Sequence, residues 1–325
     1  MLLWTKMPNR VRVFAPSSAS NLGPGFDVLG LALLKPGDIV EAELSETPGV
    51  EIAEITGDGG ALPRDPQKNV ASVAAADVLR RLDGLEAEEP HRRGVRLWLH
   101  KQMPLASGLG SSGASAVGGA VAVNELFDAP LSRYDLVASA LVGERAASET
   151  PHADNVAPSL LGGIVLVRSY DPLEMINLPV PKELRVVVVH PHCSVPTAAA
   201  RELTAERTYA LDDVVANLGN IAALVDALHR GDLTQFGRSI LDRLVEPVRA
   251  HLIPGLADVK NAALSKAALG CSVSGSGPSM VAFAESERDA QAIGDAMQDA
   301  FRNSAGLKSD VYLGPINREG ARRLA

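Results

Sequence analysis

The residues of this sequence that are best suited to chemistry lie in a stretch of glycine and serine at 104–120. Gly108, Gly110 and Gly113 can adopt backbone angles that other residues resist, and they let a bulky group approach the main chain closely. The serines that follow open a run of small residues that predicts a helix over 114–127. A serine-rich helix start beside a glycine loop offers free N–H groups and the positive end of the helix dipole. The stretch therefore predicts a phosphate-binding site.

Residues 108–113 also match the Gly-x-Gly-x-x-Gly fingerprint of dinucleotide-binding folds. That fold needs the loop to follow its strand at once, with an acidic residue at the end of a second strand about twenty residues later. Here Lys101 and the turn at Pro104 separate the loop from the strand expected at 95–100, which argues against an oxidoreductase. A Walker loop is excluded because the chain contains no Gly-Lys pair. A turn that only caps a helix, with no ligand, remains an alternative.

Pro104 and the Gly-Leu-Gly-Ser-Ser sequence resemble the ATP-binding motif of the GHMP kinases, which include galactokinase, mevalonate kinase and homoserine kinase. The order of strand, proline, glycine-serine loop and helix is the same. A later glycine-rich element, with Gly275, Ser276 and Gly277, matches the family's third motif. The resemblance implies ATP contacts from Lys101, Pro104, Leu105, Ala106, Ser107, Gly108, Leu109, Gly110, Ser111, Ser112, Gly113 and Ala114.

A second polar group lies in residues 15–33, whose glycines and prolines predict no regular structure before Val28. Asn21 and Asp27 are isolated there and could simply stabilise turns. The run Asn-Leu-Gly-Pro-Gly-Phe-Asp is similar, however, to the first motif of the homoserine kinase branch of the family. The resemblance implies that Asn21 and Asp27 bind the substrate and that Asp27 takes part in catalysis.

Glu144 lies near the end of a helix predicted over 132–147, with Ser132 as its cap. An acid on a helix is usually a surface residue, paired with a neighbour such as Arg145. In the GHMP kinases the matching glutamate coordinates Mg²⁺ together with a loop serine, here Ser112. The resemblance thus implies catalytic roles and a Mg²⁺ site at Ser112 and Glu144, whose hard oxygen atoms suit this metal.

The segment 150–158 holds His152, Asp154 and Asn155 between two prolines, and either a site or a capped turn explains this pattern. It resembles the His-x-Asp-Asn segment of the homoserine kinases, which implies substrate contacts for His152 and Asp154. Asn155 stands where several GHMP kinases have a catalytic aspartate. An amide cannot take a proton as a base, so we expect direct attack of the alcohol, with its proton passing to the phosphate.

Two isolated arginines complete the predicted pocket. Arg201 lies one turn after Thr197 in a helix expected at 197–207, and Arg249 follows a Glu-Pro pair. An isolated arginine is most often a surface residue whose stem packs on its neighbours. The match to the Glu-Pro-x-Arg stretch of the homoserine kinases implies instead that Arg201 and Arg249 bind a carboxylate, with Thr197 beside the substrate.

Composition narrows the class of protein. The chain has 325 residues, 46% hydrophobic content and a net charge of −8, which fit a globular enzyme of two domains and disfavour a nucleic-acid partner. No apolar run is long enough for a membrane span or a signal peptide, so we expect a cytoplasmic protein without a membrane partner. Two cysteines are too few for a disulfide framework. A homodimer stays open.

Alternation and helical spacing predict the secondary structure. Residues 1–9 look like a short leader, and residues 86–90 look like a solvated acidic loop. Apolar and polar residues alternate at 39–44 and 50–55, which predicts a pair of strands. Further strands are expected at 11–14, 95–100, 164–167, 184–189, 280–284 and 309–313, and helices at 69–82, 197–207, 214–228 and 287–301.

The family resemblance implies an α+β fold of two domains, the GHMP kinase fold. Residues 1–165 would form an N-terminal α/β domain like domain 2 of ribosomal protein S5, and residues 166–325 a C-terminal ferredoxin-like α+β domain. The expected activity is ATP- and Mg²⁺-dependent phosphorylation of the side-chain hydroxyl of L-homoserine, a step in threonine biosynthesis. The alternatives are a GHMP kinase for another small alcohol and a non-catalytic ligand sensor on the same fold.

Overall fold

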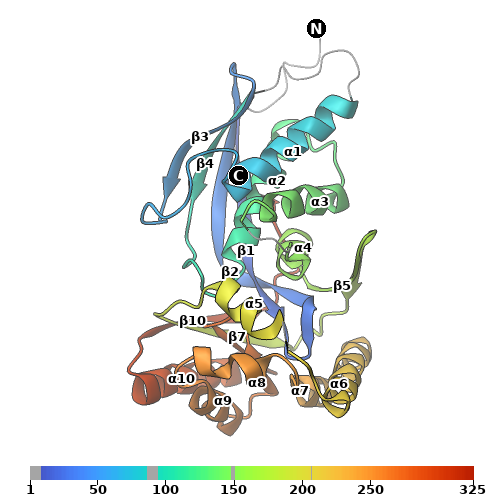
Figure 1. The fold of residues 1–325 in the computed structure, drawn as a ribbon, viewed down its shortest axis with the longest axis vertical. Coiled ribbons are helices and arrows are strands. Elements are labelled where there is room, and N and C mark those ends of the chain that lie inside the picture. The colour runs from blue at the N-terminus through green and yellow to red at the C-terminus, as the bar shows by residue number, and fades with distance from the viewer. Residues whose placement is uncertain (1–8, 86–93, 148–150, 206) are drawn as a thin grey trace.

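The computed structural model describes residues 9–85, 94–147, 151–205 and 207–325. The leader expected at 1–9 and the acidic loop expected at 86–90 lie outside these ranges, apart from Asn9. The described residues form two sheets, one above the other along the long axis, each covered by helices (Figure 1).

The first sheet is centred on β2, which pairs with β1, β4 and β5. Only β3 and β4 run parallel, and all other neighbours are antiparallel. Residues 39–44 and 50–55 therefore do not pair with each other as expected, because β4 lies between them. The strands are β1 (Arg10–Asn21), β2 (Gly25–Ser45), β3 (Gly49–Thr56), β4 (Gly94–His100), β5 (Ile164–Tyr170), β6 (Leu173–Leu178) and β11 (Arg322–Arg323).

The segment expected to be irregular before Val28 is mostly strand, so that prediction was wrong. β1 continues to Asn21 because Ser18, Ala19 and Ser20 pair with β2. Asn21 (φ +74°) then begins a tight turn of residues with positive φ, and β2 starts at Gly25. The turn brings Asn21 and Asp27 to the same end of the first sheet.

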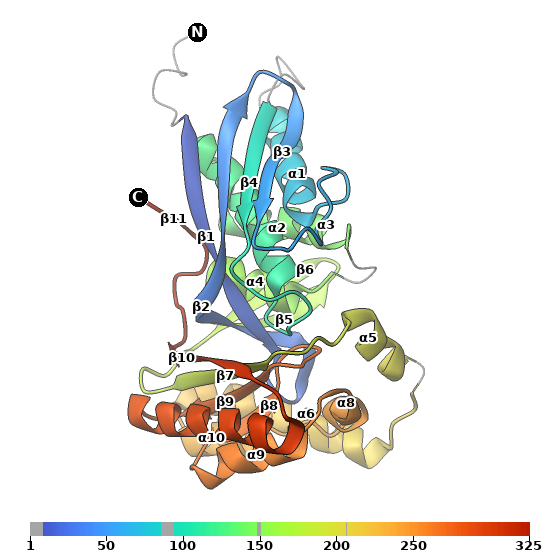
Figure 2. The same cartoon turned by 90° about the vertical axis from the view of Figure 1, so that its left-hand side faces the viewer.

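Four helices cover one face of this sheet (Figure 2). The central helix packs closely because its residues are small: a Cβ added at Gly119 would lie 2.2 Å from the carbonyl oxygen of Ala71. Its apolar residues form the first core together with Val11, Val13 and Leu97 of the sheet. The helices are α1 (Val70–Leu85), α2 (Ser111–Leu126), α3 (Arg133–Glu144) and α4 (Ala153–Leu161).

The second sheet has the order β10-β7-β9-β8 and is antiparallel throughout. This is the β-α-β-β-α-β ferredoxin-like arrangement, and the α+β, two-domain expectation is confirmed. Its strands are β7 (Arg185–Pro191), β8 (Gly270–Val273), β9 (Met280–Ala284) and β10 (Ser309–Pro315). Its helices are α5 (Thr197–Ala205), α6 (Leu211–Arg230), α7 (Leu233–Ser239), α8 (Glu246–Arg249), the 3-10 turn η2 (Ala250–Leu252), α9 (Leu256–Ser265) and α10 (Glu287–Ala305).

Strand β7 is buried on both faces and separates two further cores. Val186 and Val188 face a core shared with β2 and α6, whereas Val187 and Val189 face a core shared with α10. Leu29 and Leu31 of β2 lie in the same core as Val186 and Val188, so the two sheets pack against each other directly. This shared core fixes the β1–β2 turn above the second sheet.

The boundary expected after residue 165 falls inside β5, and β6 also belongs to the first sheet. The C-terminal β11 returns to pair with β1, so both ends of the described chain lie in the first sheet. In the part of the chain that the structure describes, no helix combines the length and the apolar character that a membrane crossing requires.

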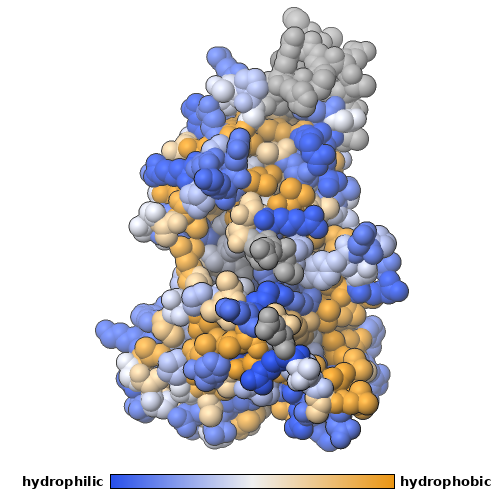
Figure 3. Space-filling view, in the orientation of Figure 1, coloured by the Kyte–Doolittle hydropathy of each residue, from blue (hydrophilic) through white to orange (hydrophobic). Residues whose placement is uncertain are grey.

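The face shown in the space-filling view carries both hydrophilic and hydrophobic areas, and one of its hydrophobic areas lies over α6 (Figure 3). Leu211, Val215 and Leu218 are exposed along it, while Leu224 and Leu228 of the same helix are buried in the core beneath.

Candidate active site

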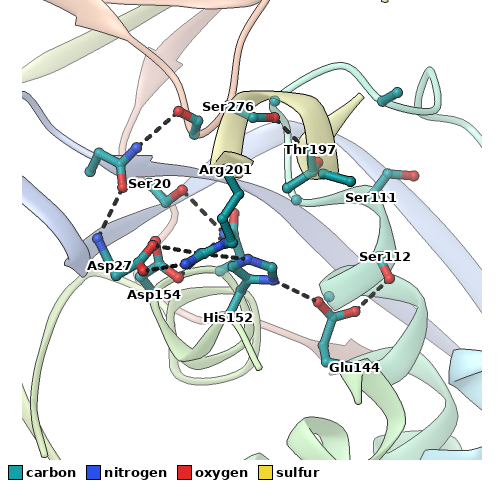
Figure 4. Close-up of a pocket in the computed structure, with 18 of the residues that line it drawn as sticks. Ser20, Asp27, Ser111, Ser112, Glu144, His152, Asp154, Thr197, Arg201 and Ser276 are labelled. Atoms are coloured by element: carbon teal, nitrogen blue, oxygen red, sulfur yellow. Dashed lines mark hydrogen bonds and ion pairs between the residues drawn. The ribbon is translucent and has the colours of Figure 1, made fainter. Parts of the chain in front are cut away.

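A cleft of about 670 Å³ opens where the two sheets meet. Figure 4 shows polar side chains converging from β1, β2, the helices α2 to α5 and the loop between β8 and β9. The lining residues are Ser20, Asn21, Phe26, Asp27, Ala106, Ser107, Gly108, Gly110, Ser111, Ser112, Gly113, Glu144, Ala147, His152, Asp154, Asn155, Thr197, Ala198, Arg201, Glu202, Ala205, Arg249, Gly275 and Ser276. Residues that the sequence separates by more than 200 positions thus share one cavity.

The glycine-serine loop forms one wall and leads directly into α2. Gly108 (φ +76°) and Gly110 (φ +65°) have left-handed backbone angles. A Cβ at Gly110 would lie 2.2 Å from Ser18 Oγ, and one at Gly108 would lie 2.3 Å from the carbonyl oxygen of Ser274. Gly113 is helical, and the nearest atom to an added Cβ is 3.4 Å away, so the backbone does not require glycine there. The close approaches to Ser18 and Ser274 fix the loop between the two sheets.

The start of α2 presents unpaired polar groups. The first N–H groups of a helix have no intrahelical acceptors, and the buried Ser111 Oγ has no hydrogen-bond partner within the described chain. Ser111 and Ser112 both line the cleft. This wall therefore offers donors to an anionic ligand.

Lys101 lies behind the loop and does not line the cleft. Its ammonium is buried and pairs with Asp38, and it also donates to the carbonyl of Ser111 at 3.1 Å and to Ser115 Oγ at 2.8 Å. Burial lowers the pKa of Lys101, although Asp38 acts in the opposite direction. Lys101 thus supports the first turn of α2 from inside.

Several residues expected at the ATP site shape the loop rather than the cleft surface. Leu109 and Ala114 are completely buried in hydrophobic cores. Pro104 and Leu105 are half-buried and do not line the cleft, and the Pro104 carbonyl accepts a hydrogen bond from Ser107 Oγ at 2.8 Å.

Glu144 is the last residue of α3 and is buried at the cleft wall. Ser112 Oγ donates to Glu144 Oε1 at 2.5 Å, and His152 Nδ1 lies 3.7 Å from Oε2 of the same carboxylate. Burial opposes the charged form of His152, but the neighbouring carboxylates of Glu144 and Asp154 raise its pKa overall. Two hard oxygen donors are thus adjacent at the start of α2.

Asp27 has a left-handed backbone (φ +59°) and is held from several sides. Its N–H donates to Asn21 Oδ1 at 3.2 Å, and Asn21 Nδ2 donates to the carbonyl of Gly275 at 2.9 Å. Tyr170 Oη donates to the carbonyl of Asp27 at 3.0 Å. Asn21 therefore orients Asp27 and joins the third glycine-rich element to the first sheet.

Asp154 and Asn155 lie in the first turn of α4. Asp154 is 1% exposed, and burial together with the nearby Asp27 raises its pKa to about 6. Asn155 Oδ1 accepts a hydrogen bond from Ser18 at 2.9 Å, and Asn155 Nδ2 donates to Ser20 at 3.1 Å. The Asn155 amide is thereby fixed against the loop.

Arg249 is buried rather than at the surface, unlike most isolated arginines. Its Nε donates to the carbonyl of Ala200 at 2.9 Å and its Nη2 to Thr204 Oγ1 at 3.4 Å. No carboxylate of the described residues lies within ion-pair distance of it, and burial lowers its pKa. Thr197 Oγ1 lies 3.3 Å from Ser276 Oγ and so joins α5 to the third glycine-rich element.

The sequence analysis did not single out Phe26, Asp38 and Tyr170. Phe26 lies inside the quoted Gly-Phe-Asp run, so its position was a usable signal. The sequence around Asp38 and Tyr170 contains no motif that indicates a role. Only the tertiary structure brings Asp38 to Lys101 and Tyr170 to Asp27.

Comparisons with known proteins show the family of the chain. The family model described as GHMP kinases N terminal domain matches residues 69–163, and the model described as GHMP kinases C terminal matches residues 224–303. The chain is 44% identical over 321 residues to a homoserine kinase of Chloroherpeton thalassium, covering 97% of this chain and 99% of that protein.

Solved structures agree as well. A crystal structure of homoserine kinase from Cytophaga hutchinsonii matches with a TM-score of 0.93 and 46% identity, covering 100% of both chains. A mevalonate kinase of L. major matches with a TM-score of 0.70 at 17% identity, over 94% of this chain and 95% of that chain, which shows a shared fold only.

Proposed function

The chain belongs to the GHMP kinase family, and from this premise we propose how its cleft performs the reaction of the homoserine kinases. The enzyme transfers a phosphoryl group from ATP to the side-chain hydroxyl of L-homoserine, giving O-phospho-L-homoserine in threonine biosynthesis. The observation that carries the residue assignments is the placement of Asp27, Asp154, Arg201 and Arg249 in one cleft beside the glycine-serine loop. The substrate is a zwitterion with an alcohol, so it needs both signs of charge and a nearby phosphate.

We assign the substrate's carboxylate to Arg249 and Arg201. Arg249 is a buried cation without a carboxylate partner in the described chain, so an incoming anion compensates its desolvation. A guanidinium can also bind a carboxylate through two hydrogen bonds. Thr197 is the neighbouring polar contact from α5.

We assign the ammonium group to Asp154 and Asp27, with His152 and Asn21 supporting them. The buried Asp154 carboxyl is costly to ionise alone, and a bound ammonium offsets that cost. The alcohol then lies near Asn155, which packs against Gly110 of the loop: a Cβ at Gly110 would be 2.8 Å from Asn155 Oδ1. This order of groups places the alcohol closest to the phosphates.

ATP would be held by the loop amides and by Ser111, whose Oγ lacks a partner within the described residues. The third motif, Gly275 to Gly277, closes the opposite side of the loop. The donor set fits Mg²⁺: a buried carboxylate and a hydroxyl oxygen are adjacent at Glu144 and Ser112. Mg²⁺ keeps several waters and binds substrate phosphates, so one carboxylate and one hydroxyl can suffice as its protein ligands. When bound, Mg²⁺ would neutralise charge on the phosphates.

Asn155 orients the acceptor and takes no proton. Phosphoryl transfer passes through a loose transition state, so the alcohol keeps its proton until late and most of the catalysis is positioning and charge neutralisation. General base catalysis is typically worth about 10² to 10⁴-fold, which positioning and electrostatic stabilisation can match. The alcohol therefore attacks directly and its proton passes to the transferred phosphate.

A coupled assay of ADP formation across matched alcohols tests this function. L-homoserine should be turned over efficiently, whereas 4-hydroxybutyrate lacks the ammonium, 3-amino-1-propanol lacks the carboxylate, and both should react far more slowly. Faster turnover of mevalonate or a sugar would favour a GHMP kinase for another alcohol. Binding without ADP formation would favour a ligand sensor. Because ATP and free amino acids are cytoplasmic metabolites, we also propose the cytoplasm as the site of action.

A further inference from the structure

Phe26 lies beside both arginines of the proposed carboxylate site. The Cζ atom of Arg249 is 5.0 Å from the centroid of the Phe26 ring, and that of Arg201 is 5.8 Å from the same centroid. The ring is half-buried and lines the cleft. In the described part of the chain, Phe26 belongs to none of the three hydrophobic cores and packs against none of them. Both guanidinium groups are therefore close neighbours of a ring that is not part of these hydrophobic cores.

The two arginines repel each other, and of the two only Arg201 has a carboxylate within ion-pair distance among the described residues. Its partner is Asp27, although this carboxylate and that of Asp242 also favour the charged form of Arg249. Burial lowers the pKa of Arg249, and the charge of Arg201 lowers it further.

The Ala200 carbonyl and Thr204 Oγ1 also hold Arg249, whereas the Phe26 ring is a neighbour of both guanidinium groups. An aromatic ring can hold two cations near one another without adding a negative charge. The face of a phenyl ring attracts cations, and guanidinium groups stack on it more readily than ammonium groups do. The attraction strengthens when the partners are shielded from water, as Arg249 is. An added acid would instead compete with the substrate carboxylate for the same guanidinium groups.

We infer that Phe26 is a positioning residue for substrate specificity: its ring orients Arg249 and Arg201 so that they receive the carboxylate of the amino-acid alcohol. This inference rests on the proposed function. The ring acts through the arginines and touches no reacting atom. Its effect is therefore on the affinity for substrates that carry a carboxylate.

The test compares Phe26→Leu with Phe26→Tyr on two alcohols, L-homoserine and 3-amino-1-propanol. Phe26→Leu removes the ring but keeps an apolar side chain. We expect it to raise KM for L-homoserine about five- to thirtyfold, while kcat and the KM for ATP stay within about twofold of wild type. With 3-amino-1-propanol the same variant should leave kcat/KM nearly unchanged. Phe26→Tyr should restore the wild-type KM because it keeps the aromatic face.

Phe14 provides a matched control. Its ring lies 5.0 Å from Cζ of Arg322, outside the cleft, so Phe14→Leu removes a comparable contact without touching the site. Phe14→Leu should leave the KM for L-homoserine unchanged. In an Arg249→Met background, Phe26→Leu should add little, because the main partner of the ring is gone.

Three results would overturn the inference: an unchanged homoserine KM in Phe26→Leu, an equal loss with both alcohols, or no rescue by Phe26→Tyr. Thermal unfolding of each variant identifies a loss caused by misfolding, which would lower the activity on both alcohols. Failure of the proposed function would show in the wild-type protein as an absence of homoserine turnover. Failure of the Phe26 assignment would show only in the variants of an active wild type.

Discussion

Arg201 and Asp27 form a two-point ion pair in which Nη1 and Nη2 each donate to one carboxylate oxygen at 3.1 Å. Arg201 comes from α5 and Asp27 from the start of β2, so the pair joins α5 to the first sheet across the cleft. We assign these two side chains to opposite ends of the substrate. In the free protein the two side chains neutralise each other. When a zwitterion binds, its carboxylate becomes the partner of Arg201 and its ammonium group becomes the partner of Asp27.

Removing the Glu144 carboxylate should reduce catalysis without unfolding the protein. Glu144→Gln keeps the shape of the side chain but removes the charge that suits Mg²⁺ beside Ser112. We expect kcat to fall and the Mg²⁺ concentration for half-maximal activity to rise, each by at least about tenfold. A Mg²⁺ titration of activity measures both quantities. The exposed Glu183→Gln is the control, and an unchanged Mg²⁺ profile in Glu144→Gln would remove this residue from the site.

Arg249 should matter for binding and not for stability. Arg249→Met replaces a buried cation, which has no carboxylate partner among the described residues, with an apolar side chain of similar length, so the free energy of unfolding should be unchanged or increased. The KM for L-homoserine should rise by at least about 30-fold, as for the loss of one partner of a buried charge pair. The KM for ATP should stay close to that of wild type. Kinetics with each substrate varied separately, together with thermal unfolding, check both statements; a normal homoserine KM would refute the assignment.

The buried Asp154 predicts a pH dependence of stability. The fold raises its pKa from 3.8 to about 6, so the folded state binds a proton that the unfolded state releases between these values. The stabilising contribution is fully present below the unfolded pKa and is lost as the pH rises through about 6. The free energy of unfolding should therefore be about 3 kcal/mol lower well above pH 6 than it is below the unfolded pKa, since one pKa unit corresponds to about 1.4 kcal/mol.

The matched variant is Asp154→Asn, which cannot ionise. It should remove this part of the pH dependence of unfolding between pH 4 and 6, and it should be more stable than wild type at pH 8. Its KM for L-homoserine should rise, because the ammonium loses a counter-charge. Denaturant unfolding across this pH range measures the first effect, and the idea fails if wild type and Asp154→Asn show parallel pH profiles.

Lys101 should act on ATP binding through the position of α2. Lys101→Met leaves Asp38 buried without its cation, which should lower the free energy of unfolding by about 3–5 kcal/mol. The loss of the contact to the carbonyl of Ser111 should also raise the KM for ATP. Denaturant unfolding and ATP kinetics measure the two effects.

The double variant Lys101→Met/Asp38→Asn separates two effects: the buried charge that Asp38 keeps when Lys101 is removed, and the lost contact between Lys101 and the carbonyl of Ser111. The amide introduced by Asp38→Asn would keep an acceptor for the N–H of Gln102, which donates to Asp38 Oδ1 at 2.9 Å. The double variant should therefore recover most of the lost stability while the KM for ATP remains raised. Equal instability of the single and double variants would contradict the proposed cause.

Asn155 should contribute through orientation. Its amide is held by Ser18 and Ser20, so Asn155→Ala loses a fixed contact near the alcohol but no base. We expect kcat to fall by no more than about 100-fold, the low end of general base effects. A loss of more than about 10⁴-fold would show instead that Asn155 is essential to the chemistry. Single-turnover measurements with saturating L-homoserine isolate this step.

The sequence alone determined the local features of the site. Gly108, Gly110 and the serines after them specify a loop and a helix start, because backbone freedom and helix capping depend on neighbouring residues. The strands at 95–100 and 184–189 and the helix capped by Ser132 are confirmed for the same reason: their periodicity and capping are local. The sheet partners of residues 39–44 could not be predicted, because the alternation of apolar and polar residues identifies a strand but not the strand with which it pairs.

The tertiary structure alone decided which side chains share the cleft and what surrounds them. Arg249 looks like a surface residue in the sequence but is buried, since burial depends on elements far along the chain that cover it. The resemblance implied that Lys101 contacts ATP, yet its ammonium pairs with Asp38 behind the loop. Phe26 acquires its two cations from α5 and α8, more than 170 positions later in the sequence. Charge, burial and long-range pairing are properties of packed neighbours, and only the fold determines which residues become neighbours.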